Sequence, residues 1–237
     1  MKEELQVKHY DEQWRYERKG VLRENHYRHF IELLKTNHLN FAASFPDRQI
    51  NNIYFDRSNF TNFTDHIEGT KSRFKPRIRW YGTLTDVKNP KLEFKIKDGN
   101  VGNKLRYNIN SFKLDSGLTE KSLFNLLKKS LSKYNVFEHI RSYHPVLLNS
   151  YVRSYFLSFD KKIRVTVDRE LTFGRFSLNG NHGKTTSPID PRCVVEIKFS
   201  SGTLAESFKL DGLSMNYLHK FSKYVEGVKH VYNLREL

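Results

Sequence analysis

The chain has 237 residues, with 41 Lys or Arg against 26 Asp or Glu, which gives a formal net charge of +15. This length suits one domain with its own core, and the 38% hydrophobic content argues against disorder. A single cysteine, Cys193, excludes an internal disulfide and favours a reducing compartment. The charge predicts an anionic partner, which is a nucleic acid, a membrane surface or a phosphorylated compound.

The first residues, MKEELQVKHYDEQW, lack the apolar core of a secretory signal. No uninterrupted apolar run reaches the ~18 residues of a membrane-spanning helix. We therefore expect a cytoplasmic protein that forms one domain over residues 1–237.

Mostly strands are expected, because much of the sequence alternates with period two. The predicted elements are a strand at 13–19, a helix at 24–35, a strand at 50–56, a helical turn at 59–67, strands at 73–82, 91–97 and 104–109, a helix at 119–133 capped by Thr119, strands at 145–158, 162–168, 171–176 and 192–200, and a last helix from near Ser214 that includes Phe221. Loops are expected at 98–103 and 179–191. Short spacers between several strands favour antiparallel pairing.

The charged residues of these strands share one face of each strand. Adjacent residues point to opposite faces, so Arg77 and Arg79 lie on one side of their strand while Ile78 and Trp80 lie on the other. The same parity groups Glu17 with Lys19, Arg73 with Lys75, Glu93 with Lys95 and Lys97, Lys104 with Arg106, Tyr151 with Arg153, Arg164 with Thr166 and Asp168, and Glu196 with Lys198.

Two arrangements fit this pattern. In one, the charged faces are an ordinary solvated surface; in the other, the sheet curls and they line a tunnel. The amphipathic helices favour the tunnel, because they need an apolar outer wall on which to pack. A tunnel rich in Arg and Lys, with single carboxylates at Glu17, Glu93 and Glu196, suits a polyanion and a divalent metal.

Nine runs in order also resemble a known family. They are RYERK (15–19), IYFD (53–56), RIRWYG (77–82), LEFKIK (92–97), KLRY (104–107), PVLLNSYVRSYF (145–156), IRVTVDREL (163–171), VVEIKF (194–199) and FSKYVEGV (221–228). Together they resemble the VTC-type polyphosphate polymerase domain, a branch of the triphosphate tunnel metalloenzymes (the CYTH-like superfamily). The resemblance covers nearly the whole chain.

The resemblance implies an α+β fold, with an antiparallel eight-stranded β-barrel tunnel and amphipathic helices packed on its outside. It implies metal-dependent transfer of the γ-phosphoryl group of ATP to a growing polyphosphate chain, with release of ADP and with Mn²⁺ or Mg²⁺ as cofactor. The implied partners are ATP and inorganic polyphosphate. Nucleic acid is disfavoured, because no nucleic-acid motif is recognised. Relatives can work beside a membrane protein, which would place this chain at the inner face of a membrane through a partner.

Carried over residue by residue, the resemblance implies three sets of site residues. The catalytic cations are Lys19, Arg77, Arg79, Arg153, Lys198 and Lys223. The phosphate-binding residues are Lys95, Lys97, Lys104, Tyr151, Arg164 and Ser222, with the choice between Lys95 and Lys97 open. Glu196 is the expected principal metal ligand, and Glu17 is the second.

One departure from the wider superfamily matters. Many tunnel enzymes begin with Glu-x-Glu-x-Lys, whereas here Arg15 replaces the first acid before Glu17 and Lys19. This loss argues against a two-metal triphosphatase but would also occur in a tunnel that only binds its ligand. The alternatives are therefore a triphosphate hydrolase and a non-catalytic tunnel for polyphosphate or inositol phosphates.

Some residues on the charged faces have open roles. Asp168 either binds metal or orients Arg164 or Arg153, and Glu93 is expected to pair with a neighbouring cation. Tyr81 either packs at the tunnel mouth or stacks on a base. Candidates for guiding a longer product are Arg73, Lys75 and Arg106.

Overall fold

The computed structural model describes residues 15–98, 101–176, 190–200 and 221–234. Its elements are β1 (Arg15–Arg23), η1 (Glu24–His26), α1 (Tyr27–Thr36), β2 (Ala42–Asp56), α2 (Thr61–Ile67), β3 (Ser72–Tyr81), β4 (Asp86–Val87), β5 (Lys91–Asp98), β6 (Val101–Asn108), β7 (Phe112–Lys113), α3 (Glu120–Ser130), η2 (Phe137–His139), β8 (His144–Leu157), β9 (Ile163–Arg175), β10 (Arg192–Ser200) and α4 (Lys223–Tyr232).

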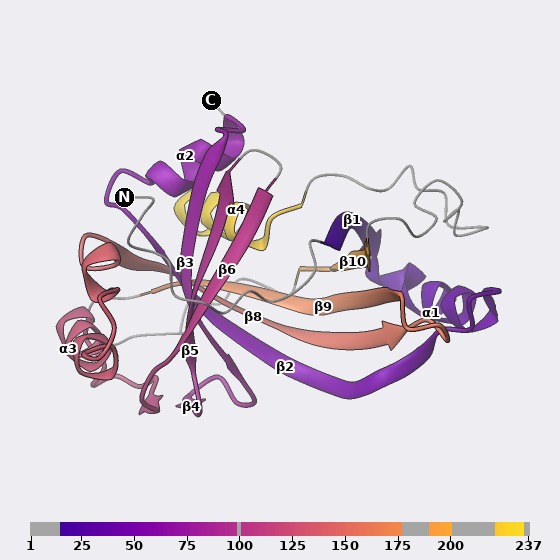
Figure 1. The fold of residues 1–237 in the computed structure, drawn as a ribbon, viewed down its shortest axis with the longest axis horizontal. Helices are drawn as coiled ribbons and strands as arrows, with labels where there is room; N and C mark the ends of the chain where they lie inside the picture. Colours follow the sequence, from indigo (N-terminus) through magenta and orange to yellow (C-terminus); the bar gives the residue numbers. More distant parts are fainter. Residues whose placement is uncertain (1–14, 99–100, 177–189, 201–220, 235–237) are drawn as a thin grey trace.

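One eight-stranded sheet dominates the fold, in the order β1-β10-β9-β8-β2-β3-β5-β6. Every neighbouring pair in it is antiparallel. The sheet is strongly twisted, so that β3, β5 and β6 run at a steep angle to β8 and β9 (Figure 1). The expected α+β class with eight antiparallel strands is therefore confirmed. Within the described ranges no pairing joins β1 to β6, so the expected closed barrel is not confirmed.

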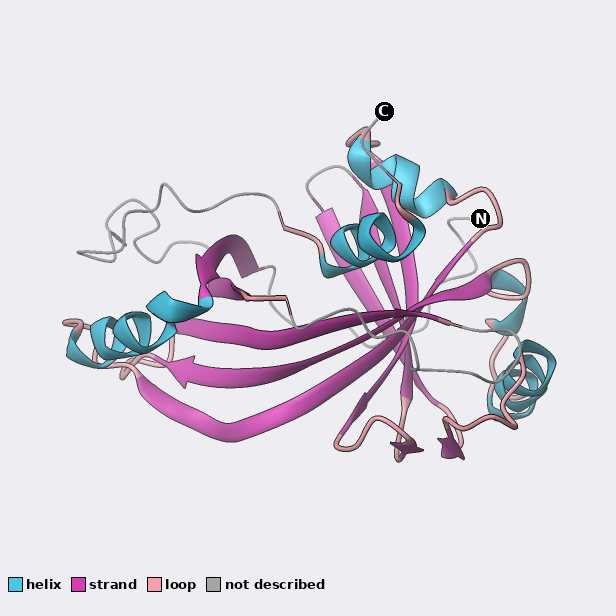
Figure 2. Cartoon of the chain, turned by 180° about the vertical axis from the view of Figure 1, so that it is seen from behind, coloured by secondary structure: helices cyan, strands magenta, loops and turns pink. Residues whose placement is uncertain are grey.

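Two helices cover the apolar face of the sheet, at opposite ends of the molecule (Figure 2). Leu123 and Leu127 of α3 pack in one cluster with Trp80 and Phe94. Phe30 and Leu34 of α1 pack in another, among apolar residues of β8, β9 and β10. The side chain of Thr119 accepts a hydrogen bond from the backbone N–H of Ser122 at 3.1 Å, which confirms the predicted cap of α3.

Helix α4 packs on the opposite, polar face, so the expectation that the helices lie outside is wrong for this one. Val225 and Val228 of α4 pack with Leu147, Phe173 and Val194. Val194 is two residues from Glu196 on β10 and so shares its face. A Cβ atom at Gly227 would lie 2.6 Å from side-chain atoms of both Leu147 and Phe173. The glycine therefore allows the helix to approach the sheet closely.

The predicted helix near Ser214 lies outside the described residues, whereas α4 begins at Lys223 after the N-cap Ser222. The strands predicted at 162–168 and 171–176 form a single strand, β9. The β8–β9 pairing shifts register between Ser150↔Thr172 and Val152↔Arg169, which together with the positive φ of Glu170 marks a bulge on β9 that breaks its alternation. Strand β6 begins at Val101, within the predicted loop.

Candidate functional site

The charged sides of the strands form one concave face of the curled sheet, which we call the inner face. Lys95 on β5 places its Nζ 3.9 Å from Oε1 of Glu17 on β1, although these two strands are not paired. The sheet therefore curls enough for side chains near its two edges to meet. This contact favours the tunnel arrangement over a flat solvated surface.

Glu93 is the centre of a cation cluster on three adjacent strands, although it is only 3% exposed. The Nη2 atom of Arg77 lies 2.7 Å from its Oε2, and Nζ of Lys104 lies 2.6 Å from its Oε1. Arg106 lies 3.3 Å away and Arg79 lies 3.9 Å away. Burial opposes ionisation of Glu93, but Arg77, Arg79 and Lys104 outweigh it and hold the pKa of its carboxyl well below the usual value. The expected pairing of Glu93 with neighbouring cations is confirmed.

This cluster has more positive than negative charge. Burial, followed by repulsion from Arg77, lowers the pKa of Lys104 to about 6 despite its contact with Glu93. Arg79 donates from Nε to Oδ1 of Asn52 at 3.0 Å and from Nη2 to the hydroxyl of Tyr151 at 3.1 Å. Neutral partners thus orient this guanidinium, and the Glu93 carboxylate, 3.9 Å away and shared with other cations, offsets its charge only in part.

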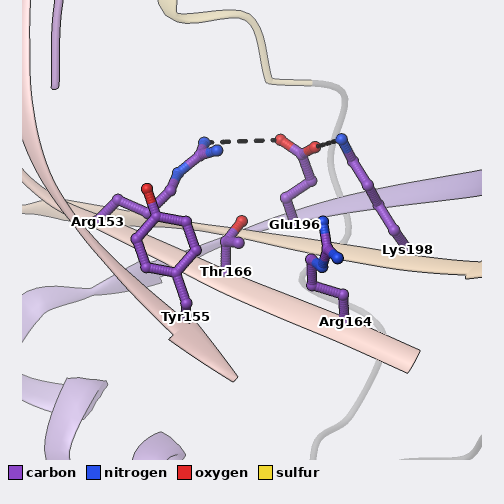
Figure 3. A pocket seen from close by; sticks show the side chains of 6 residues that line it. All are labelled: Arg153, Tyr155, Arg164, Thr166, Glu196 and Lys198. Carbon is purple, nitrogen blue, oxygen red and sulfur yellow. Dashed lines mark ion pairs between the residues drawn. The ribbon is translucent and has the colours of Figure 1, made fainter. Parts of the chain in front are cut away.

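A second group of charges surrounds Glu196, beside a cavity of about 80 Å³. The cavity is lined by Arg153, Tyr155, Arg164, Thr166, Glu196 and Lys198 (Figure 3). Oε1 of Glu196 lies 2.6 Å from Nζ of Lys198, and its Oε2 lies 3.9 Å from both Arg153 and Lys19. Burial raises the pKa of Glu196, but Lys19, Lys198 and Arg153 outweigh this effect, so that pKa lies well below the usual value.

Asp168 connects this group to helix α4. The buried carboxylate accepts two hydrogen bonds from Arg153, Nε to Oδ1 at 2.5 Å and Nη2 to Oδ2 at 2.7 Å. Lys223, the first residue of α4, places its Nζ 2.5 Å from Oδ2. Of the roles considered for Asp168, the structure supports the orientation of Arg153.

Basic side chains of the inner face also lie beside the start of α4. Lys75 donates from Nζ to Oγ of Ser222 at 3.2 Å and lies 2.9 Å from Nδ1 of His66. Burial, together with Lys75 and Arg73, lowers the pKa of His66 to about 3. His66 is therefore neutral at physiological pH, and its ring nitrogen accepts the hydrogen bond from Lys75.

The carboxylates of Glu17 and Glu196 suit a metal ion whose coordination is completed mainly by the phosphate oxygens of a bound substrate. Glu17 lies 2.7 Å from Lys19 and 3.5 Å from Lys198. Across the ranges that the structure describes, no group of three or more His, Cys, Asp or Glu side chains is arranged to hold a metal. However, the buried Oγ1 of Thr166 has no hydrogen-bond partner and lies beside Glu196, its pairing neighbour across the strands. Glu17, Glu196 and Thr166 thus offer the oxygen ligands that Mg²⁺ and Mn²⁺ prefer, while phosphate oxygens would complete the coordination.

The structure places almost all of the predicted site residues on the inner face. Those with contacts there are Glu17, Lys19, Arg77, Arg79, Lys95, Lys104, Tyr151, Arg153, Glu196, Lys198, Ser222 and Lys223. Arg164 lines the cavity. The side chain of Lys97 lies outside the described residues, so the choice between Lys95 and Lys97 stays open.

Sequence reasoning missed several polar partners. Asn52 and Tyr54 hold the guanidinium groups of Arg79 and Arg77, and His66 approaches Lys75 from α2. Asn52 and Tyr54 share a parity in the predicted strand at 50–56, and this parity is the signal that could have found them.

The comparisons with known proteins identify the family. The model of the VTC domain matches residues 14–232. The chain belongs to the VTC domain family. This confirms the resemblance that the nine runs carried. A comparison with curated proteins finds no significant match.

Two solved structures illustrate more distant likenesses to this VTC domain. A Vibrio parahaemolyticus protein with a proposed adenylate cyclase assignment shares 12% identity at a TM-score of 0.47, over 90% of this chain and 98% of that chain. A Pyrococcus horikoshii protein shares 13% identity at a TM-score of 0.40, over 89% and 94% of the two chains. Scores this low do not establish a common activity. Among the described helices, none has the length and apolar character needed to cross a membrane.

Proposed function

We propose that this VTC domain is an ATP-dependent polyphosphate polymerase. Its reaction would take place inside a basic tunnel that the curled sheet forms. The observation that supports this most is the excess of cations over carboxylates on the inner face. Glu93 alone is shared by Arg77, Arg79, Lys104 and Arg106. A triphosphate or a polyphosphate chain carries negative charges at regular intervals. These charges would neutralise the successive cations that line the inner face.

The chemistry needs positioning and charge stabilisation more than it needs a reactive side chain. The terminal phosphate oxygen of the growing chain attacks the γ-phosphorus of ATP. A new P–O bond forms, the bond between the γ-phosphorus and the β,γ-bridging oxygen breaks, and ADP leaves with the electron pair. Arg77 and Arg79 offer forked donors to the transferring group, while Lys19, Lys104, Lys198 and Lys223 act as point charges.

Arg153 has a pre-set orientation in this reaction, because Asp168 holds its guanidinium by two hydrogen bonds. Glu196, Glu17 and Thr166 are the residues that would hold Mn²⁺ or Mg²⁺. When bound, the ion supplies neutralisation of the charge that develops on phosphate oxygens. The phosphate-binding roles of Lys95, Tyr151, Arg164 and Ser222 belong to the same proposal, as do the cytoplasmic location and a membrane-protein partner.

A non-catalytic tunnel is the second candidate, and one observation favours it. Lys198 lies 2.6 Å from Oε1 of the expected metal ligand Glu196, so a cation already neutralises this carboxylate. Such a tunnel would bind polyphosphate or inositol phosphates without turnover.

The test incubates the protein with ATP and Mn²⁺ and measures ADP and acid-insoluble polyphosphate together. The polymerase yields both products. Free phosphate alone would identify a hydrolase, whereas binding of tripolyphosphate without turnover would identify a binding tunnel. The matched control is Asp86→Asn, because Asp86 makes an exposed ion pair with Lys88 on the small β4–β7 sheet.

A further inference from the structure

An exposed group of aromatic rings around Arg48 lies where β3 ends. The Cζ atom of Arg48 is 4.8 Å from the ring centre of Phe45, 5.8 Å from that of Tyr81 and 5.6 Å from that of Tyr155. The rings of Phe45 and Tyr155 meet edge to face at 5.7 Å. Three strands, β2, β3 and β8, contribute these four residues, which we call the aromatic platform.

The platform adjoins the phosphate-binding interior. Tyr155 belongs to the platform and also lines the cavity beside Glu196 (Figure 3). Arg48 pairs across the strands with Arg153, which Asp168 orients. Tyr81 is two residues from Arg79 and therefore shares its face of β3. A ligand that enters the cavity past Tyr155 thus has the platform beside its outer end.

The platform exposes apolar rings that an ordinary surface would bury. Phe45 is 49% exposed and Tyr81 is 48% exposed, although both are large aromatic side chains. The neighbouring carboxylate of Asp47 forms its ion pair with Arg169, with Nη2 of Arg169 3.0 Å from Oδ2 of Asp47, rather than with Arg48. A flat aromatic ligand would cover these rings and also stack on the planar guanidinium of Arg48.

We infer that the aromatic platform binds the nucleobase of the nucleoside triphosphate whose phosphates enter the interior. This inference rests on the proposed function and adds the part of the substrate that phosphates alone do not specify. Stacking accepts any base, because every base has a π-face. The platform therefore increases the affinity for nucleotides over inorganic phosphates without strong selection among nucleobases.

The test compares two ligands on the same variants by isothermal titration calorimetry. The ligands are a non-hydrolysable ATP analogue and inorganic tripolyphosphate, which lacks the base and the ribose. The variants are Phe45→Ala, Tyr81→Ala and the double variant. Phe159→Ala is the matched control, because Phe159 is 85% exposed and lies outside the platform.

We expect each platform substitution to weaken the ATP analogue about 10-fold, the range of one lost stacking contact, and to change the tripolyphosphate affinity less than about 2-fold. Phe159→Ala should change neither affinity. Equal losses for both ligands, or no loss for the ATP analogue, would overturn the platform and leave the proposed function standing. If neither ligand binds the unmodified protein, the proposed function fails, and the platform fails with it.

Discussion

Lys223 and Asp168 join helix α4 to the inner face of the sheet at a nitrogen-to-oxygen distance of 2.5 Å. The same Asp168 carboxylate holds Arg153. The position of the helix and the orientation of a proposed catalytic cation are therefore set by one buried group, so a change that displaces α4 is expected to disturb both.

Gly227→Ala tests this connection. The added Cβ atom would lie 2.6 Å from Leu147 and Phe173, which is too close, so α4 must shift. We expect a loss of about 1–3 kcal/mol in the free energy of unfolding, the usual cost of overpacking, together with weaker tripolyphosphate binding. Denaturant unfolding and calorimetry measure the two effects. His230→Ala, on the exposed side of the same helix, is the control, and an unchanged stability of Gly227→Ala would refute the close packing.

Glu93→Gln removes the negative charge that its neighbouring cations share. Breaking a buried ion pair costs about 3–5 kcal/mol, so we expect a loss of stability near the lower end of this range. Tripolyphosphate should restore more stability to this variant than to the parent, because the ligand replaces the lost charge. Thermal unfolding with and without the ligand measures this. Asp86→Asn, at an exposed pair, should cost at most about 1 kcal/mol.

Stability of the ligand-free protein should rise between pH 8 and 9. Repulsion from Lys19, followed by burial, lowers the pKa of Lys95 to about 8, and burial lowers that of Lys104 to about 6. The unfolded chain, with lysine pKa values near 10.4, binds more protons in this window than the folded one, so unfolding is disfavoured as pH rises. Lys19 has a raised pKa and keeps its proton in both states, so it does not contribute here.

Chemical denaturation at pH 8.0, 8.5 and 9.0 measures this slope. Tripolyphosphate should flatten it, because the bound anion keeps both lysines charged in the folded state. A flat or falling profile without ligand would contradict the interpretation that the surroundings of these two lysines lower their pKa values in the folded protein.

Glu196→Gln tests the metal site by a readout other than turnover. In the presence of tripolyphosphate, we expect the variant to bind Mn²⁺ at least about 10-fold more weakly, measured by electron paramagnetic resonance of free Mn²⁺. Without metal, its tripolyphosphate affinity should be equal or higher, since Lys19 and Lys198 lose a competing carboxylate. Asp47→Asn serves as the control, and unchanged Mn²⁺ binding by Glu196→Gln would remove Glu196 from the metal site.

The sequence predicted which charged residues share a face, because strand periodicity leaves little freedom. Arg77 and Glu93 lie on the same face of paired strands, as predicted, but the register that places them opposite each other was not predicted. The sequence predicted helices on the outer face of the sheet, which is wrong for α4. Its apolar stripe shows that the helix must be buried somewhere, but the partners Leu147, Phe173 and Val194 come from three other strands.

The aromatic platform was also only partly predictable. Tyr81 was a candidate for base stacking, but Phe45 and Arg48 lie in a part of β2 that is mostly exposed and was not predicted to be a strand. Their meeting with Tyr155 depends on the register of β2 against β8, which contains two shifts between Ala43 and Arg48. Such irregularities arise from tertiary packing and leave no periodic signal.

The contact between Lys95 and Glu17 gives ionic strength a structural role. It joins the two edge regions of the curled sheet through side chains, while no backbone pairing between β1 and β6 is present in the described residues. Salt screens a partly exposed pair of this kind far more than it affects a backbone hydrogen bond. High salt should therefore weaken this contact between the edge regions as well as the attraction of the inner face for anions, so that the curl of the sheet depends on the composition of the solution.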